Sequence, residues 1–147
     1  MTLIIPLELM HKLHTQAESS YPEEGAGLLL GIVNDDTRSV RSIMELNNAR
    51  ESDARFNRYL ITPRDMLRAE EEAAQRGMDV LGVFHSHPDH PSQPSEFDRQ
   101  WAMPWFSYLI TSVESGKAAG IRSWRLTENR EAFTEEQIEI REPHTAE

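Results

Sequence analysis

The order of hydrophobic and polar positions along this chain predicts a mixture of strands and helices. Short apolar runs bounded by turn residues are typical of strands that are buried on one or both faces. Such runs mark eight candidate segments for a sheet of about seven strands, the last of them an edge strand marked by Phe133 and Ile138–Ile140. The expected ranges before it are Leu3–Ile5, Gly25–Val33, Arg38–Leu46, Ala54–Ile61, Asp79–His85, Trp105–Val113 and Ala118–Leu126.

A spacing of three to four residues between apolar positions predicts two long helices. The first is expected over Pro6–Ser19, and its apolar stripe consists of Leu7, Met10, Leu13 and Ala17. The second is expected over Pro63–Gln75, with Thr62 as its N-cap and Gly77 at the C′ position. Its buried side is expected to hold Met66, Leu67, Ala69, Ala73 and Ala74.

A third, short helix is expected over Ser95–Met103, where Pro104 ends it. The long helices stand between runs of strands, not in a regular strand–helix–strand repeat. The sequence therefore predicts an α/β (α+β) domain, with a mixed β-sheet flanked by two long helices and one short helix. This single domain is expected to span residues 1–140, with a polar C-terminal tail over residues 141–147.

Composition excludes several classes of protein. The 147 residues include no cysteine, which excludes disulfides, zinc fingers and cysteine-ligated zinc deaminases. A formal net charge of −10 disfavours nucleic acid and anionic membranes as partners. The apolar runs are too short for a membrane span or a secretory leader. We therefore expect a cytoplasmic protein, and its oligomeric state is left open.

Two histidines and one aspartate lie close together in the sequence and suggest a metal site. Because His85 and His87 are two residues apart, an extended strand would point both imidazoles to one face. Ser95 and Asp98 are three residues apart, which suits the first turn of a helix. Two neutral imidazoles and one carboxylate commonly hold a catalytic zinc and leave a fourth position open for water. The intervening loop is stiffened by prolines at positions 88, 91 and 94.

Simpler interpretations of the same residues remain open. Ser95 to Asp98 also fits a helix N-cap with an acidic residue at the third helical position, which needs no metal. The two interpretations are compatible, because a capping serine can also face a site. Glu23 and Glu24 precede the glycine-rich strand and could supply a base there, although such pairs are usually solvated. The remaining histidines considered, expected at the surface, are His11, His14 and His90.

The complete pattern resembles the motif of the JAMM (MPN+, JAB) metalloproteases. That motif has a distant glutamate, then His-x-His-Pro, seven residues before a serine and two more before an aspartate. Here Pro88–Pro94 are the seven residues, and the strand Gly27-Leu28-Leu29-Leu30-Gly31 selects Glu24 over Glu23. The resemblance covers roughly residues 3–126 and implies an MPN/JAB-like (cytidine-deaminase-like) fold. The roles it implies are zinc ligands for His85, His87 and Asp98, general base and acid for Glu24, and oxyanion stabilisation for Ser95.

The resemblance also implies a function. The family hydrolyses the bond after the C-terminus of ubiquitin or a ubiquitin-like protein, by glutamate-assisted attack of a zinc-bound water. This short chain resembles the compact stand-alone prokaryotic form, so the expected substrate is the tail of a sulfur-carrier-type protein. The alternatives are a non-catalytic scaffold of the same fold and a two-histidine, one-carboxylate iron enzyme of another fold. Trp101, Trp105 and Phe106 are candidates for lining a substrate groove, although apolar packing explains them equally well.

Overall fold

The structure is a computed structural model that describes residues 2–46 and 61–142, without the side chains of Phe97 and Trp101. Its strands are β1 (Thr2–Pro6), β2 (Ala26–Asn34), β3 (Thr37–Leu46), β4 (Asp79–Pro88), β5 (Ser107–Glu114), β6 (Lys117–Leu126) and β7 (Phe133–Arg141). Its helices are α1 (Leu7–Ser20), α2 (Pro63–Gln75) and α3 (Glu96–Trp101). The predicted strand Ala54–Ile61, except for its last residue, lies outside the described residues, as do residues 143–147 of the predicted tail.

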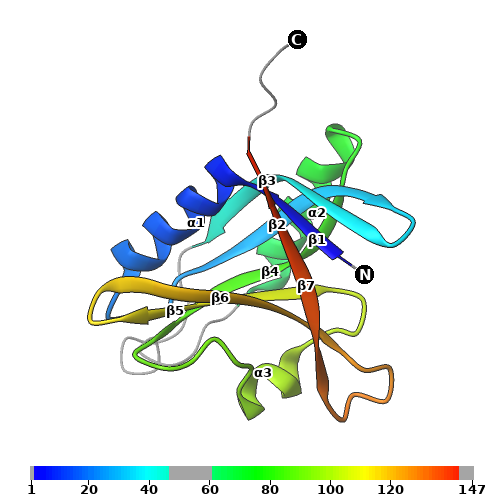
Figure 1. Ribbon diagram of the computed structural model, residues 1–147. Coiled ribbons are helices and arrows are strands. Elements are labelled where there is room, and N and C mark those ends of the chain that lie inside the picture. The colour runs from blue at the N-terminus through cyan, green and yellow to red at the C-terminus, as the bar shows by residue number, and fades with distance from the viewer. Residues whose placement is uncertain (1, 47–60, 143–147) are drawn as a thin grey trace.

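The strands form one mixed sheet that closes into a barrel in the order β1-β3-β2-β4-β5-β6-β7 (Figure 1). β1 pairs in parallel with β3 and β7, and β4 pairs in parallel with β5. The predicted mixed sheet is confirmed, but β7 is not an edge strand. Residues 133–136 of β7 pair with β6, and residues 137–141 pair with β1. Barrel closure removes the free edge, and a partner from the opposite end of the chain leaves no local sequence signal.

α1 covers one side of the barrel, where it packs against β1, β5, β6 and β7. Its predicted apolar stripe is largely confirmed, because Met10, Leu13 and Ala17 are buried. They belong to a core cluster that also contains Phe84 of β4, whereas Leu7 is only half-buried. The burial of this stripe holds the helix against the sheet.

α2 packs against β4 and β2, and Thr62 caps its first turn as predicted. Ala69 and Ala73 are buried, but Leu67 is 55% exposed and Ala74 is also exposed. The prediction was wrong for these two residues because only a narrow face of the helix meets the sheet. None of the helices within residues 2–46 and 61–142 is both long enough and apolar enough to cross a bilayer.

β4 continues three residues beyond the predicted end at His85. Ser86, His87 and Pro88 remain paired with the neighbouring strand β5. Both histidines of the motif therefore lie within one regular strand, between β2 on one side and β5 on the other. This placement gives their side chains a rigid backbone.

α3 ends at Trp101, two residues before the predicted end at Met103. Met103 precedes a proline, and such a residue is disfavoured in the helical conformation. Arg130, in the turn between β6 and β7, donates hydrogen bonds to the carbonyls of Gln100 (3.2 Å) and Ala102 (2.7 Å). These bonds satisfy carbonyls that the helix leaves unpaired and hold α3 against that turn.

Candidate metal centre

β4 directs the imidazoles of His85 and His87 to the same side of the sheet. His85 is fully buried and His87 is 8% exposed. Ser86, between them, points the other way, and its hydroxyl accepts a hydrogen bond from the N–H of Gly25 (2.7 Å). The alternation of side chains along a strand thus produces the paired arrangement predicted from the His-x-His spacing.

Asp98 reaches the histidines from the first turn of α3. Its N–H donates to the hydroxyl of Ser95 (3.1 Å), and its Oδ2 accepts from the N–H of Ser95 (2.8 Å). This reciprocal pair is a capping box. The cap is therefore compatible with a metal-binding role for Asp98, because the capping hydrogen bonds fix the position of its carboxylate.

Three residues with potential ligand atoms form a small triangle, in which each imidazole faces a different carboxylate oxygen of Asp98. The Nε2 atoms of His85 and His87 are 3.1 Å apart. Oδ1 of Asp98 lies 3.4 Å from Nε2 of His85, and its Oδ2 lies 3.3 Å from Nε2 of His87. Within the part of the chain that the structure describes, this is the only cluster of histidine, cysteine or acidic residues with metal-binding geometry. The three residues named from the sequence are therefore brought together and could hold a metal ion.

The hydrogen bonds around His87 prepare its Nε2 for a metal. Its Nδ1 lies 2.8 Å from the carbonyl oxygen of Pro91, so Nδ1 carries the proton and donates it. The Nε2 atom then keeps its lone pair. An outer hydrogen bond of this kind orients the ring and increases its basicity as a ligand.

The charges in the site also favour a cation. Burial lowers the pKa of His85 and outweighs the neighbouring Asp98 carboxylate. Burial acts on His87 in the same direction, but Asp98, the Pro91 carbonyl and the charge of Glu24 together raise the pKa of His87. Burial alone would raise the pKa of Asp98, yet the two histidines hold it well below its usual range. The site thus keeps an ionised carboxylate beside a neutral imidazole, the protonation states that a metal requires.

Glu24 lies immediately beside this triangle. The carbonyl of Gly25 accepts a hydrogen bond from the N–H of Ser86 (3.0 Å), and Ala26 pairs with His85. Continuing this antiparallel register by one more pair places Glu24 next to His87. The charge of Glu24 raises the pKa of His87, which is consistent with this placement. Glu24 is 4% exposed, whereas the adjacent Glu23 is only half-buried.

A model of the family described as prokaryotic homologs of the JAB domain matches residues 6–127 of this chain. The chain belongs to the prokaryotic JAB family. The predicted family and its JAB-like fold are therefore confirmed.

The chain is also similar to named relatives and to a solved structure. A probable TtuB-protein conjugate cleaving protease of Thermus thermophilus is 28% identical over 134 residues, which cover 89% of this chain and 80% of that protein. A desampylase of Pyrococcus furiosus is 32% identical over 127 residues, covering 86% and 83% of the two chains. The solution structure of a Desulfitobacterium hafniense protein matches with a TM-score of 0.83 and 31% identity, over 96% of this chain and 94% of that one.

The JAB chain also contains supporting residues that the sequence analysis missed. Asp89 follows β4 with a positive φ of 56° and accepts hydrogen bonds from the hydroxyl of Tyr21 (2.7 Å) and the N–H of Ser115 (2.8 Å). Tyr21 belongs to the turn that carries Glu24, so this contact ties the glutamate segment to the histidine loop. Nothing in the local sequence signals it, because the two residues meet only in the folded barrel.

The loop between His87 and Ser95 is held by two further strands. Ser112 of β5 donates a hydrogen bond to the carbonyl of His90 (2.6 Å), and the indole of Trp124 in β6 donates to the carbonyl of Ser92 (3.0 Å). The side chain of His90 is exposed, as predicted. The loop is therefore fixed by its backbone, which stabilises the positions of His87 at one end and of the Ser95–Asp98 cap at the other.

Of the aromatic residues after the motif, Trp105 and Phe106 lie away from the metal centre. Phe106 is buried in the core, which confirms the packing interpretation for this residue. Trp105 is 46% exposed, and its ring lies 4.3 Å from the guanidinium of Arg38. Trp105 and Phe106 directly precede β5, whose first residue pairs with Gly82 near the beginning of β4. The histidines lie at the other end of β4, so these two aromatic residues are far from them along the strand. The predicted position of Trp101 in a groove falls outside the described side chains.

Proposed function

We propose that this JAB protein is a zinc-dependent isopeptidase that hydrolyses the bond after the C-terminus of a ubiquitin-like protein of the sulfur-carrier type. The observation that carries the proposal is the triangle of His85, His87 and Asp98, with a buried Glu24 beside it. The names of two relatives support it, since one refers to cleavage of TtuB-protein conjugates and the other is a desampylase.

The donor set and its dimensions suit zinc. Around a tetrahedral zinc ion with bonds of about 2.0–2.1 Å, neighbouring donors lie about 3.3 Å apart. The two imidazole nitrogens are 3.1 Å apart, and each lies 3.3–3.4 Å from one carboxylate oxygen of Asp98, which is close to that value. Two imidazoles also favour zinc over the hard cations magnesium and calcium, which prefer oxygen donors. Three protein ligands leave one coordination position open, as in catalytic sites.

The residues around the triangle supply the remaining chemistry. Bound zinc contributes a Lewis acid that polarises the carbonyl of the scissile bond. Glu24 takes a proton from the attacking water as the water oxygen bonds to the carbonyl carbon. The Ser95 hydroxyl already accepts from Asp98 and keeps its own proton to donate to the oxyanion. The carbon–nitrogen bond then breaks, and Glu24 delivers the proton to the departing amine.

The proposal is tested with a fusion in which a ubiquitin-like protein ending in Gly-Gly precedes a reporter protein. We expect the wild-type chain to bind stoichiometric zinc and to cleave at the junction. Glu24→Gln is expected to keep the zinc and lose about 10²–10⁴-fold in kcat, the usual contribution of a general acid–base group. Glu23→Gln, in the same turn, is the matched control and is expected to behave like wild type.

Other results would contradict the proposal and identify an alternative. An absence of bound metal, or unchanged cleavage by Glu24→Gln, would exclude the proposed mechanism. Stoichiometric zinc without hydrolysis of any tagged substrate would favour a non-catalytic scaffold. Oxidation activity that requires iron and is not supported by zinc would favour a two-histidine, one-carboxylate iron enzyme.

A further inference from the structure

The end of the barrel opposite the metal centre holds three charged side chains, two of them buried and one half-buried. Arg38 of β3 is 1% exposed, Glu136 of β7 is buried, and the Arg125 side chain of β6 is 24% exposed. Arg38 donates a hydrogen bond to the carbonyl of Leu81 (2.9 Å), near the beginning of β4. Because the histidines lie at the other end of β4, this charged cluster of Arg38, Arg125 and Glu136 is separate from the metal centre.

The charged cluster contains more positive than negative charge. Its single carboxylate, Glu136, accepts a hydrogen bond from the hydroxyl of Ser123 (2.9 Å) and lies 3.7 Å from a guanidinium nitrogen of Arg125. Burial, followed by the charge of Arg125, lowers the pKa of Arg38 to about 10, and Glu136 offsets only part of this effect. A buried charge that lacks a full counter-charge is costly, so an additional anion would stabilise this arrangement.

Several polar atoms of the charged cluster also lack a hydrogen-bond partner. The Nε atoms of Arg38 and Arg125 and the Oε2 atom of Glu136 are buried, and none makes a hydrogen bond within the described residues. Buried donors without an acceptor are rare in folded proteins. Two of these three atoms are donors on arginine and the third is a carboxylate acceptor. Arg125 lines a pocket beside the cluster, whereas Arg38 does not.

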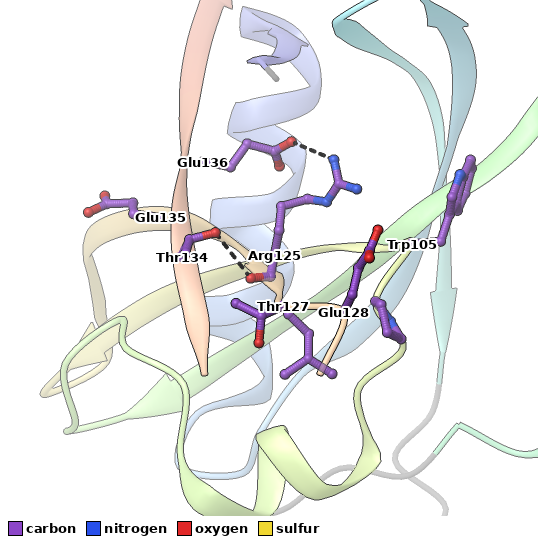
Figure 2. A pocket seen from close by; sticks show the side chains of 9 residues that line it. Trp105, Arg125, Thr127, Glu128, Thr134, Glu135 and Glu136 are labelled. Atoms are coloured by element: carbon purple, nitrogen blue, oxygen red, sulfur yellow. Dashed lines mark hydrogen bonds and ion pairs between the residues drawn. The ribbon is translucent and has the colours of Figure 1, made fainter. Parts of the chain in front are cut away.

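A pocket of about 520 Å³ opens beside the charged cluster and is lined by both Arg125 and Glu136 (Figure 2). The indole of Trp105 also lines it and presents a planar, partly exposed surface. Glu128 and Glu135 also line the pocket, which therefore has three carboxylates and one guanidinium in its lining, and the remaining lining residues are Pro104, Leu126, Thr127 and Thr134. Glu135 is neutralised by Arg122, whose guanidinium nitrogens lie 2.6 and 3.0 Å from its carboxylate, and Glu128 is exposed.

We propose that this pocket binds a small organic anion, with its carboxylate or phosphate group held by Arg125 and its planar apolar part against Trp105. A guanidinium presents a fork of donors that matches both kinds of anion. The pocket volume lies within the range of small-molecule sites. The proposal concerns a second site and does not depend on the proposed hydrolysis.

Ligands of equal size and opposite charge test this proposal on the wild-type chain. Benzoate and benzamidine share a phenyl ring, and each is titrated while the Trp105 indole N–H is followed by NMR, with Trp105→Phe used for assignment. We expect saturable benzoate binding at least about tenfold tighter than benzamidine binding, as loss of a charge-assisted hydrogen bond predicts. Phenyl phosphate is the third ligand, and the tighter of the two anions identifies the preferred group.

Variants then locate the anion. Arg125→Gln is expected to weaken benzoate binding at least about tenfold. Glu128→Gln removes an exposed negative charge and is expected to tighten binding about two- to fivefold. Arg76→Gln is the matched control and should change nothing, because Arg76 is an exposed arginine at the C-cap of α2 that pairs with Glu72.

Two results would contradict the proposed anion site. Equal affinity for benzoate and benzamidine, or no saturable shift with either anion, would show that the charged cluster serves only to stabilise the barrel. Unchanged benzoate affinity in Glu128→Gln would remove the pocket from consideration as the binding site. Both tests remain informative if Arg125→Gln fails to fold, because neither uses that variant.

Discussion

The two ends of the barrel bury charged side chains in different ways. At the metal end, backbone groups orient the ligands: the carbonyl of Pro91 holds His87, and the N–H of Ser95 holds Asp98, each at 2.8 Å. At the opposite end, Arg125 and Glu136 are held largely by side-chain contacts to neighbouring strands. At the metal end, the side chains are therefore positioned by backbone groups a few residues away in the chain. At the other end, they are positioned by contacts between strands of the closed barrel.

This difference predicts that substitutions at the two ends of the barrel have different effects. Asp98 lies on a short helix after a long loop, outside the strands of the barrel. Arg38 lies inside the barrel on β3. This strand pairs with β1, and β1 pairs with β7, where the barrel closes. We therefore expect substitutions at the metal end to change metal binding and catalysis, and substitutions at the opposite end to change stability.

Asp98→Ala is expected to have the largest effect. Loss of an outer hydrogen-bond partner of a metal ligand costs about 10–100-fold in metal affinity, so removal of a ligand is expected to cost at least about 10³-fold. The chain should stay folded, with a loss of only about 1 kcal/mol from the helix cap. Competition with a chromophoric chelator measures the affinity, and circular dichroism measures the fold. Loss of the folded signal would show that the site is structural.

Arg38→Ala is expected to produce the opposite result. Removing one member of a buried charged group and leaving a cavity typically costs about 3–5 kcal/mol of unfolding free energy. Zinc affinity should remain that of the wild type. Arg38→Met keeps most of the side-chain volume and is expected to cost less. Urea unfolding measures all three proteins, and a parallel loss of zinc affinity in Arg38→Ala would contradict the independence of the two ends.

Ser95→Ala sharpens the comparison within the metal end. The hydroxyl is proposed to stabilise the oxyanion, so its loss is expected to lower kcat about 10²–10³-fold. Zinc affinity should fall much less, because the N–H that binds Asp98 is retained. Metal titration and kcat are measured on the same preparation. Equal losses in both quantities would assign Ser95 to ligand positioning alone.

Alkaline pH is expected to weaken the core between the two ends. Burial raises the pKa of Tyr108 in β5 to about 12 from its ordinary value of 10.0, although the N–H of Met103 partly offsets this. Because the folded value exceeds the unfolded value, this stabilisation is complete below pH 10 and is lost as the pH rises from 10 to 12. The expected loss is about 2–3 kcal/mol.

Tyr108→Phe provides the control for this pH effect, because phenylalanine has no group that ionises. Unfolding by urea between pH 9 and pH 11.5 should show a steeper loss of stability for the wild type than for the variant. Parallel curves for the two proteins would contradict the assignment of this effect to Tyr108.

Much of the candidate site was predictable because its geometry is local. The spacing of His85 and His87 decides which way their rings point once the segment is a strand. The capping box of Ser95 and Asp98 likewise depends on backbone geometry within one helical turn. The choice of Glu24 over Glu23 came from the family resemblance, and the register between β2 and β4 then explains it, because that register places Glu24 beside His87.

By itself, the sequence determined the candidate ligand set and most of the helices and strands, since each depends on contacts between residues close along the chain. It also determined the family, through the spacing of the motif. Only the tertiary structure decided that β7 closes the barrel onto β1, that Tyr21 meets Asp89, and that Arg38 lies under Trp105. These contacts join residues far apart in the chain. Their formation depends on the packing of the whole sheet and on the entropy of closing long loops, which no local pattern records.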